Sequence, residues 1–207
     1  RLVSSVCDID KEAGPSEVVV IADDNADPRF VAMELLAQAE HDEEARAILV
    51  TTSADLVPRV EAAMKEEMAT LSRTKIIEQS LADFGAIYVV RNVDEAACLA
   101  SEIAPEHISI QTDNPKVVFG KVRNCGCAVL GGLTPVALGD YYAGPNHILP
   151  TGRRARFAGP LTADQFMKIT SILSYTRDGL ATAYDDIRRI AESEGFTAHA
   201  RAVERRL

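Results

Sequence analysis

Val18-Val19-Val20-Ile21, followed by Asp23-Asp24-Asn25, is the stretch that decides how this chain folds. A short, continuous apolar run of this kind is typical of a strand that is buried on both faces. The polar residues directly after it indicate that the strand ends there. A helical pattern then runs from Asp27 to about Glu40. The sequence therefore predicts a buried strand that leads into a helix.

This alternation of strand and helix recurs along the next hundred residues. Further strands are predicted at 47–50, 87–90, 108–110 and 128–130, and further helices at 56–71, 73–84 and 93–103. Parallel strands need crossover connections, so the alternation favours a mainly parallel sheet that is covered on both faces. The predicted fold class is α/β and Rossmann-like. No G-x-G-x-x-G motif follows any predicted strand, so the sequence predicts no cofactor-binding residues in this chain.

The pattern changes after Gly132. Residues 139–152 are rich in Gly, Pro, Asn and Tyr and show little periodicity, and long irregular segments in compact domains are often functional. Beyond Leu161 the chain turns helical again, with predicted helices that begin near 162 or 164, cover 172–194 and cover 197–206. We therefore expect two domains: a Rossmann-like α/β domain over residues 1–158 and a small helical C-terminal arm over residues 159–207. The arm has little core of its own and should pack on something else.

Composition excludes several classes of protein. The chain has 207 residues, of which 47% are hydrophobic, so it can bury a core. Its longest apolar runs fall far short of the roughly 20 residues that cross a bilayer, so no membrane partner is expected. The formal charge of −9 disfavours binding to nucleic acid. The four cysteines show no metal-binding or disulfide spacing, which predicts a cytoplasmic protein with ordinary thiols.

Two of the four histidines suggest a metal site. Gln38 and His41 lie three residues apart on a predicted helix, so they share a face and can touch one ion. An imidazole nitrogen and an amide oxygen are both plausible zinc ligands, although glutamine is an unusual one. Asp140 could add a carboxylate and His199 a second imidazole, but separations this long carry no local signal. Taken one at a time, each histidine fits a surface or hydrogen-bonded role better than a ligand role.

Glu106 and His107 raise a different question, because neighbours in a regular strand point to opposite faces. The two side chains can share a site only where the backbone is irregular, and Pro105 makes such an irregularity plausible. A carboxylate and an imidazole that converge on one substrate would give two proton acceptors with different pKa values. A multi-step oxidation needs such a pair.

Five sequence blocks carry a family resemblance. They are AGPSEV at 13–18, LAQAEH at 36–41, APEH at 104–107, LGDYYAGPNHILPT at 138–151 and EGFTAH at 194–199. In order and spacing they resemble the signature blocks of the histidinol dehydrogenases, over about residues 10–203. The block G-D-Y-x-A-G-P-N-H-x-L-P-T is specific even alone.

The resemblance implies a site and its ligands. One Zn²⁺ per subunit would be held by Gln38, His41, Asp140 and His199, with His199 coming from the partner subunit of a homodimer. Glu106 and His107 match the two proton acceptors. The positions that match the lining of the L-histidinol site are Ser16, Gln38, His41, His107, Asp140, His147, Glu194 and His199.

The activity that the resemblance implies is a two-step, NAD-linked oxidation of L-histidinol, through the aldehyde, to L-histidine. Family members are roughly twice as long, so we expect this chain to be a C-terminal portion with an incomplete Rossmann-like domain. Most of the NAD⁺ site should then lie in the N-terminal half. Two alternatives stay open: a non-catalytic truncated fragment of that enzyme, or a same-family dehydrogenase for another alcohol, such as a sulfonated diol. The Glu194 match and the full zinc set favour histidinol over the latter.

Overall fold

The computed structural model describes residues 6–7, 9–10, 12 and 14–207, and the chain divides into two compact units, Arg1–Phe166 and Met167–Leu207. The first unit contains a five-stranded sheet in the order β3-β2-β1-β4-β5. All four neighbouring pairs are parallel, which confirms the predicted fold class. The strands are β1 (Glu17–Ala22), β2 (Arg46–Thr51), β3 (Ala86–Val89), β4 (His107–Gln111) and β5 (Cys127–Leu130).

Strand β1 lies at the centre of the sheet, between β2 and β4. Its residue Val18 aligns with Ala47 of β2 on one side and with His107 of β4 on the other. Every residue of β1 is buried. The unbroken apolar run that predicted this strand follows from that position, because neither face of a central parallel strand meets water.

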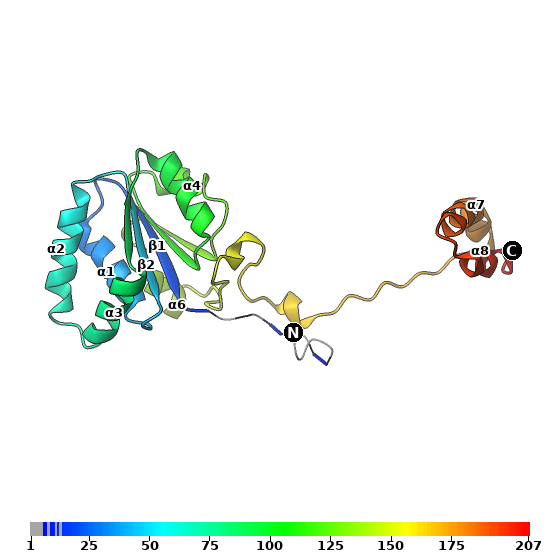
Figure 1. Ribbon diagram of the computed structural model, residues 1–207, viewed down its shortest axis with the longest axis horizontal. Coiled ribbons are helices and arrows are strands. Elements are labelled where there is room, and N and C mark those ends of the chain that lie inside the picture. The colour runs from blue at the N-terminus through cyan, green and yellow to red at the C-terminus, as the bar shows by residue number, and fades with distance from the viewer. Residues whose placement is uncertain (1–5, 8, 11, 13) are drawn as a thin grey trace. The chain divides into compact units, whose positions relative to one another are not determined.

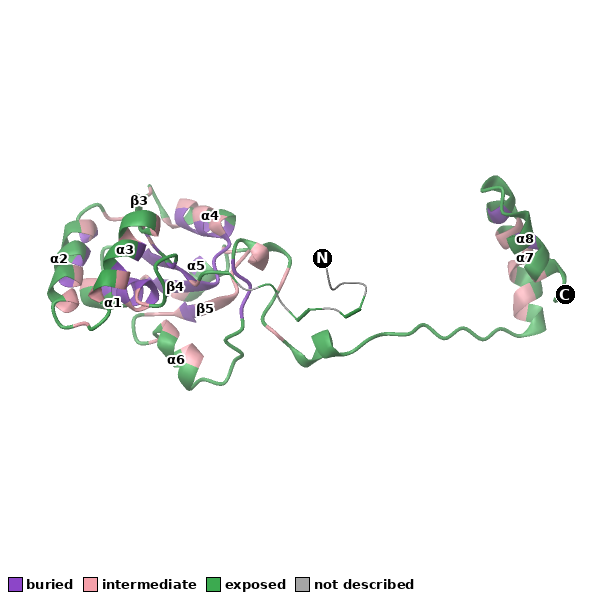
Figure 2. Cartoon of the chain, turned by 60° about the horizontal axis from the view of Figure 1, so that its bottom comes forward, coloured by how far each residue is buried: buried purple, intermediate pink, exposed green. Residues whose placement is uncertain are grey.

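Helices cover both faces of the sheet (Figure 1). On one face lie α1 (Pro28–Ala39), α2 (Leu56–Met68) and α3 (Thr74–Phe84), and on the other lie α4 (Val93–Ile103) and α5 (Pro115–Phe119). Alternate residues of β1 serve the two cores: Val18 and Val20 pack with Leu36 of α1, while Val19 and Ile21 pack with α4. Each such fully buried side chain contributes about 1.5 to 3 kcal/mol relative to exposure. Figure 2 shows the buried residues concentrated in this layered region.

Local signals fix where the helices begin and end. The Asp27 carboxylate accepts a hydrogen bond from the backbone N–H of Arg29 at 2.9 Å, and Pro28 occupies the first helical position of α1. The Asn92 side chain caps α4 in the same way, 2.9 Å from the N–H of Glu95. Helix α4 ends at Ala104, whose φ of 51° lies in the left-handed region. This turn redirects the chain just before β4.

Two short helices were not predicted from the sequence. Helix α5 has five residues, and α6 (Val136–Tyr141) has six and begins before the segment 139–152 that was expected to be irregular. A helix of fewer than two turns shows too little periodicity to be recognised. A single 3₁₀ turn, η1 (Arg154–Arg156), interrupts the otherwise irregular chain that follows.

The helical pattern beyond Leu161 is less continuous than predicted. A 3₁₀ turn, η2 (Ala163–Phe166), stands where the first helix was expected. In the second unit α7 (Arg177–Ser193) begins later than residue 172, because the Thr176 hydroxyl accepts from the N–H of Gly179 and caps the helix there. Gly195, with φ of 76°, ends α7, and α8 (Thr197–Glu204) follows.

The second unit buries little of its own surface. In its two helices, over residues 177–204, only Ala191 and Ala200 are buried. Such a helix pair has almost no apolar core of its own. No helix in the part of the chain that the structure describes has the length and apolar character to span a membrane.

Candidate active site

The candidate catalytic residues lie at the edge of the sheet where the parallel strands begin, which we call the amino edge. Glu17 is the first residue of β1, His107 is the first of β4, and Glu106 directly precedes it. All three are buried, with exposed fractions of 5 to 7%. The backbone N–H of Glu17 donates to Oε2 of Glu106 at 3.0 Å, which joins the starts of the two strands.

Glu106 and His107 share one site although they are neighbours in sequence. Oε2 of Glu106 lies 3.6 Å from Nδ1 of His107. The left-handed Ala104 turns the backbone before Pro105, so Glu106 stands outside the regular alternation of β4. The start of β5 fixes this segment, since the N–H groups of Gly126 and Cys127 donate to the carbonyls of Pro105 and Glu106 at 3.0 and 2.8 Å. The sequence predicted an irregular backbone at Pro105, and the structure has it one residue earlier, at Ala104.

Asp140 reaches this pair from helix α6. Its Oδ1 lies 3.6 Å from Nε2 of His107. The helix is held in place by Glu34 of α1, whose two carboxylate oxygens accept from the N–H of Val136 at 3.3 and 3.2 Å. His107 therefore lies between two carboxylates, one at each ring nitrogen.

Three of the four predicted zinc ligands line one cavity of about 240 Å³. Gln38 lies in the last turn of α1 and Asp140 on α6, and Glu34 and Tyr141 also line the cavity. The prediction that His41 lies on the same helix was wrong: α1 ends at Ala39, and His41 lines the cavity from the chain directly after it. Gln38 is buried, and its Nε2 has no hydrogen-bond partner. An unsatisfied buried amide is costly, so its position at a cavity favours a ligand there.

The side chains that line this cavity can be compared with the ligands that zinc prefers. Among the described residues, no three His, Cys, Asp or Glu side chains gather closely enough to hold a metal by themselves. What the cavity offers is one amide, one imidazole and one carboxylate, which are nitrogen and oxygen donors of the kinds that zinc accepts. These residues fit a zinc ion whose coordination is completed by a further ligand from elsewhere.

Burial shifts the pKa values of Glu106 and His107. It raises the pKa of Glu106 to about 7. The negative charges of Glu17 and Asp140 also raise this pKa, whereas the hydrogen bond from the backbone N–H of Glu17 lowers it. Burial lowers the pKa of His107, although Asp140 opposes this. At neutral pH the imidazole is therefore neutral and able to accept a proton.

The four cysteines are free. Burial raises the pKa of the Cys125 thiol to about 11, and burial and then Asp140 raise the pKa of Cys127. A thiol with a raised pKa is a poor nucleophile at neutral pH. This agrees with the interpretation of these residues as ordinary thiols.

The other predicted substrate-binding residues are spread over both units. Ser16 precedes β1, and its carbonyl accepts from the N–H of Arg46 at 2.9 Å. His147 is exposed in the irregular segment after α6. In the second unit Glu194 follows α7, and His199 is exposed on α8 with its ring 5.3 Å from that of Phe196.

Two residues of the site were not singled out from the sequence. Glu17 lies inside a block that drew attention to Ser16, yet its buried carboxylate accepts from the N–H of Gly152 at 3.3 Å and lies 3.6 Å from Arg46. Burial raises the pKa of both Glu17 and Glu34. A signal for Glu34 existed: it lies four residues before Gln38, hence on the same face of α1.

The geometry can now be compared with known proteins. A sequence profile described as histidinol dehydrogenase matches residues 1–207. The chain belongs to the histidinol dehydrogenase family. The buried pair Glu106 and His107, the carboxylate of α6 and the cavity at the end of α1 are thus features of a histidinol dehydrogenase family member.

Individual relatives agree with this assignment. The chain is 46% identical over 207 residues to the histidinol dehydrogenase of Halalkalibacterium halodurans and 47% identical over the same length to that of Syntrophotalea carbinolica. It covers 49% and 48% of those proteins, so it spans about half the length of the curated relatives it matches. A crystal structure of histidinol dehydrogenase from Elizabethkingia anophelis is similar with a TM-score of 0.87 at 34% identity, over 95% of this chain and 45% of that one.

Proposed function

We propose that this chain carries the zinc, substrate and proton-transfer residues of an enzyme that oxidises L-histidinol to L-histidine in two NAD-linked steps. The observation that carries the proposal is the buried pair Glu106 and His107, whose imidazole lies beside Asp140. Asp140 in turn lines a cavity together with Gln38 and His41. Family membership narrows the chemistry to an oxidoreductase of histidine biosynthesis.

The metal and the cofactor have limited roles in this proposal. When bound, zinc would act as a template for the imidazole and amino nitrogens of the substrate, and NAD⁺ would accept a hydride in each step. Gln38, His41 and Asp140 would hold the zinc together with His199, while most contacts to NAD⁺ would lie outside this chain.

His107 would take the hydroxyl proton of the alcohol. Its imidazole is buried and its pKa is lowered by burial, so it is available as a base at neutral pH. The carboxylates on its two sides would stabilise the imidazolium that forms when the proton arrives. The positive charge would then remain close to Asp140 and Glu106.

Glu106 would activate the water that hydrates the aldehyde. A carboxylate with a pKa of about 7 is half ionised at neutral pH and is a stronger base than an exposed glutamate. The N–H of Glu17 holds one of its oxygens at 3.0 Å and so orients the group. Only the second oxidation needs this water, so the two residues have separable duties.

The test replaces the pair one residue at a time in the intact protein. Glu106→Gln should slow aldehyde oxidation by about 100- to 10,000-fold and alcohol oxidation far less, whereas His107→Asn should slow both. Both half-reactions are measured with NAD⁺, together with a thermal melt, and Glu102→Gln, at an exposed position on α4, serves as the matched control. Equal slowing of the two steps by Glu106→Gln would contradict the assignment.

The same proposal extends to assembly and location. The almost coreless second unit fits an arm that packs on the partner subunit of a homodimer and contributes His199 and Glu194 to the site of that partner. Mixing a His41→Ala protein with a His199→Ala protein should restore part of the activity, because one mixed site would then have all four ligands. The enzyme is expected to work in the cytoplasm.

A further inference from the structure

A second pocket lies at the opposite edge of the sheet, where the strands end. Strands β1 and β4 are neighbours, but the helices that follow them, α1 and α5, cover opposite faces. In open parallel sheets, ligands bind at this point, outside the carboxyl ends of the strands. A pocket of about 230 Å³ is found there, lined by the residues that directly follow β1 and β4. The proposed oxidation uses the amino edge and makes no use of this pocket.

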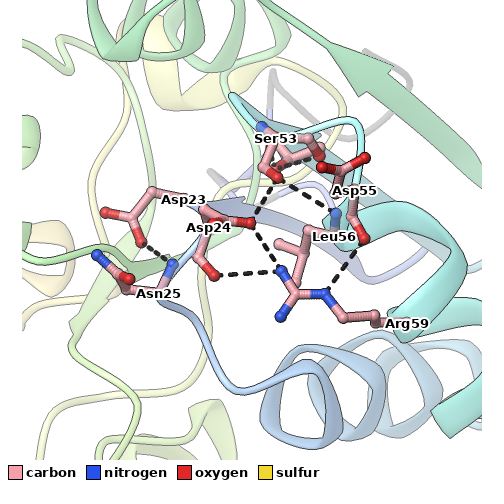
Figure 3. A network of polar contacts seen from close by, with 8 residues as sticks. Asp23, Asp24, Asn25, Ser53, Asp55, Leu56 and Arg59 are labelled. Carbon is pink, nitrogen blue, oxygen red and sulfur yellow. Dashed lines mark hydrogen bonds and ion pairs between the residues drawn. The ribbon is translucent and has the colours of Figure 1, made fainter.

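The walls of the pocket are fixed by side chains on both sides of the loop after β1. On one side, Oδ1 of Asp24 accepts from Ser53 and from Arg59, each at 2.8 Å, which fastens the loop to β2 and α2 (Figure 3). On the other side, Asp23 accepts from the N–H of Asp113 at 2.8 Å, and Asn25 donates to the Asp113 carboxylate at 2.8 Å. The pocket is therefore held in shape without a ligand.

Buried polar atoms at the bottom of the pocket lack partners. Gln111, the last residue of β4, is only 5% exposed and lines the pocket. Its Nε2 donates to Ser109 at 3.3 Å, but its Oε1 has no hydrogen-bond partner, and neither has the buried Oγ1 of Thr112 beside it. A buried acceptor without a donor is costly, so the site is suited to a ligand that brings N–H groups.

The charge of the pocket selects the sign of the ligand. Asp23, Asp27 and Asp113 line it, and none of the lining residues is Lys or Arg. Asp27 is paired with Arg29 at 3.1 Å, so the remaining negative charge is that of Asp23 and Asp113. Helix α1 starts here, but Pro28 has no N–H and the N–H of Arg29 already donates to Asp27. The start of the helix therefore has few free N–H groups to donate to an anion. A cation is therefore favoured and a phosphate is not. Since the described residues contain no cluster of three metal-binding side chains, the carboxylates do not converge on a bare metal ion.

An aromatic ring completes the pocket. Phe30 lines it with 42% of its surface exposed, and Gly132 lies beside one edge of the ring, where an added Cβ would come within 3.0 Å of Phe30 Cδ2. Part of the ring surface is therefore accessible. Aromatic faces attract organic cations, and carboxylates together with an amide oxygen accept their N–H groups.

We propose that this pocket binds a small organic ammonium ion, with the N–H groups on Gln111, Asp23 and Asp113 and the carbon skeleton against Phe30. The site is separate from the candidate active site, because Gln111 and His107 are the two ends of β4, about 13 Å apart at the rise of an extended strand. The proposal therefore does not rest on the proposed function. It needs only the first unit of the chain.

Three probes of one shape and different charge test the proposal on the intact protein: benzylammonium, benzyl alcohol and benzoate. Binding is followed by nuclear magnetic resonance through the side-chain amide of Gln111 and the backbone amide of Thr112. Benzylammonium should shift both signals in a saturable way, and the other two probes should bind at least about threefold more weakly, as the loss of an exposed charge interaction predicts. Equal binding of all three, or shifts by benzylammonium only at other residues, would overturn the proposal.

Matched variants separate the pocket from the general negative charge of the protein. Asp113→Asn keeps an acceptor for Asn25 but removes one charge, and Phe30→Leu keeps an apolar wall but removes the ring, so each should weaken benzylammonium about two- to fivefold. Asp55→Asn, an exposed carboxylate in the neighbouring loop that does not line the pocket, should leave binding unchanged. If Asp55→Asn weakened benzylammonium binding as much as Asp113→Asn does, binding would reflect only the general negative charge of the protein. That result would refute the site.

Discussion

Replacing Glu106 by Gln should change the pH dependence of folding stability in a definite direction. The carboxyl has a pKa of about 7 in the folded protein, against an ordinary value of 4.5. Below pH 4.5 it is protonated in both states, so ionisation has no effect on stability. As the pH rises from 4.5 to 7, the unfolded chain releases the proton and the folded chain keeps it, so the free energy of unfolding falls. Above pH 7 the loss is complete.

The magnitude follows from the size of the shift. A difference of about 2.5 units between 4.5 and 7 corresponds to about 3 kcal/mol in total, at about 1.4 kcal/mol per unit. Between pH 5.5 and pH 8 the loss is about 2 kcal/mol, because part of it has already occurred below pH 5.5. Glutamine carries no titrating proton, so this loss should be missing in the variant.

The assay is urea unfolding of the metal-free protein at pH 5.5 and pH 8, followed by far-ultraviolet circular dichroism, since the chain has no tryptophan. The free energy of unfolding of the parent minus that of Glu106→Gln should fall by about 2 kcal/mol from pH 5.5 to pH 8. Taking this difference cancels the contribution of all other titrating groups. Glu43→Gln, at an exposed position after α1, is the control and should show no such change. A parent-minus-variant difference for Glu106 that is the same at both pH values would refute the reasoning.

Two further predictions concern the metal and the backbone of the site. His41→Ala and His199→Ala should each remove tightly bound zinc from the intact protein, and elemental analysis that finds undiminished zinc in both would contradict the ligand assignment. Gly126→Ala should lower the free energy of unfolding in urea by about 1 to 3 kcal/mol, because the added Cβ would come within 2.6 Å of a carbonyl oxygen. Gly159→Ala, which has open space around the added atom, is the control and should be nearly neutral. Equal losses of stability in the two variants would show that the close approach does not matter.

The fold could be predicted from the sequence where burial dictates residue type along a whole element. The apolar run of β1 and the helical pattern of α4 each correspond to a central strand and a helix that packs on it, and the predicted bounds of α4, 93–103, match the structure. The helices α5 and α6 could not be predicted, because each is fixed by contacts with distant residues and not by its own pattern. The N–H of Val136, at the start of α6, is held by Glu34 of α1, 102 residues earlier in the chain.

The site could be predicted only in part, for similar reasons. The spacing of Gln38 and His41 predicted a shared helix face; α1 ends at Ala39, before His41, but the structure does place both residues at one cavity. The meeting of Glu106 and His107 depends on a left-handed alanine, and residue type does not indicate that conformation, since glycine or asparagine usually adopts it. The blocks shared with the histidinol dehydrogenases pointed to Glu106 and His107, and the structure places these two side chains together. They converge because of a backbone turn that sequence spacing does not show.

The position of the candidate site at the amino edge has one more consequence, which comes from the direction of the helices. In a parallel sheet with crossover helices, the helices run opposite to the strands, so α1 and α4 both end at the edge where Glu106 and His107 lie. The carboxyl end of a helix carries the equivalent of about half a negative charge from its aligned peptide dipoles. Two such ends, added to the buried carboxylates, create a standing negative potential before any ligand arrives. A cationic substrate should therefore be drawn toward this edge, and its association rate should fall as salt is added.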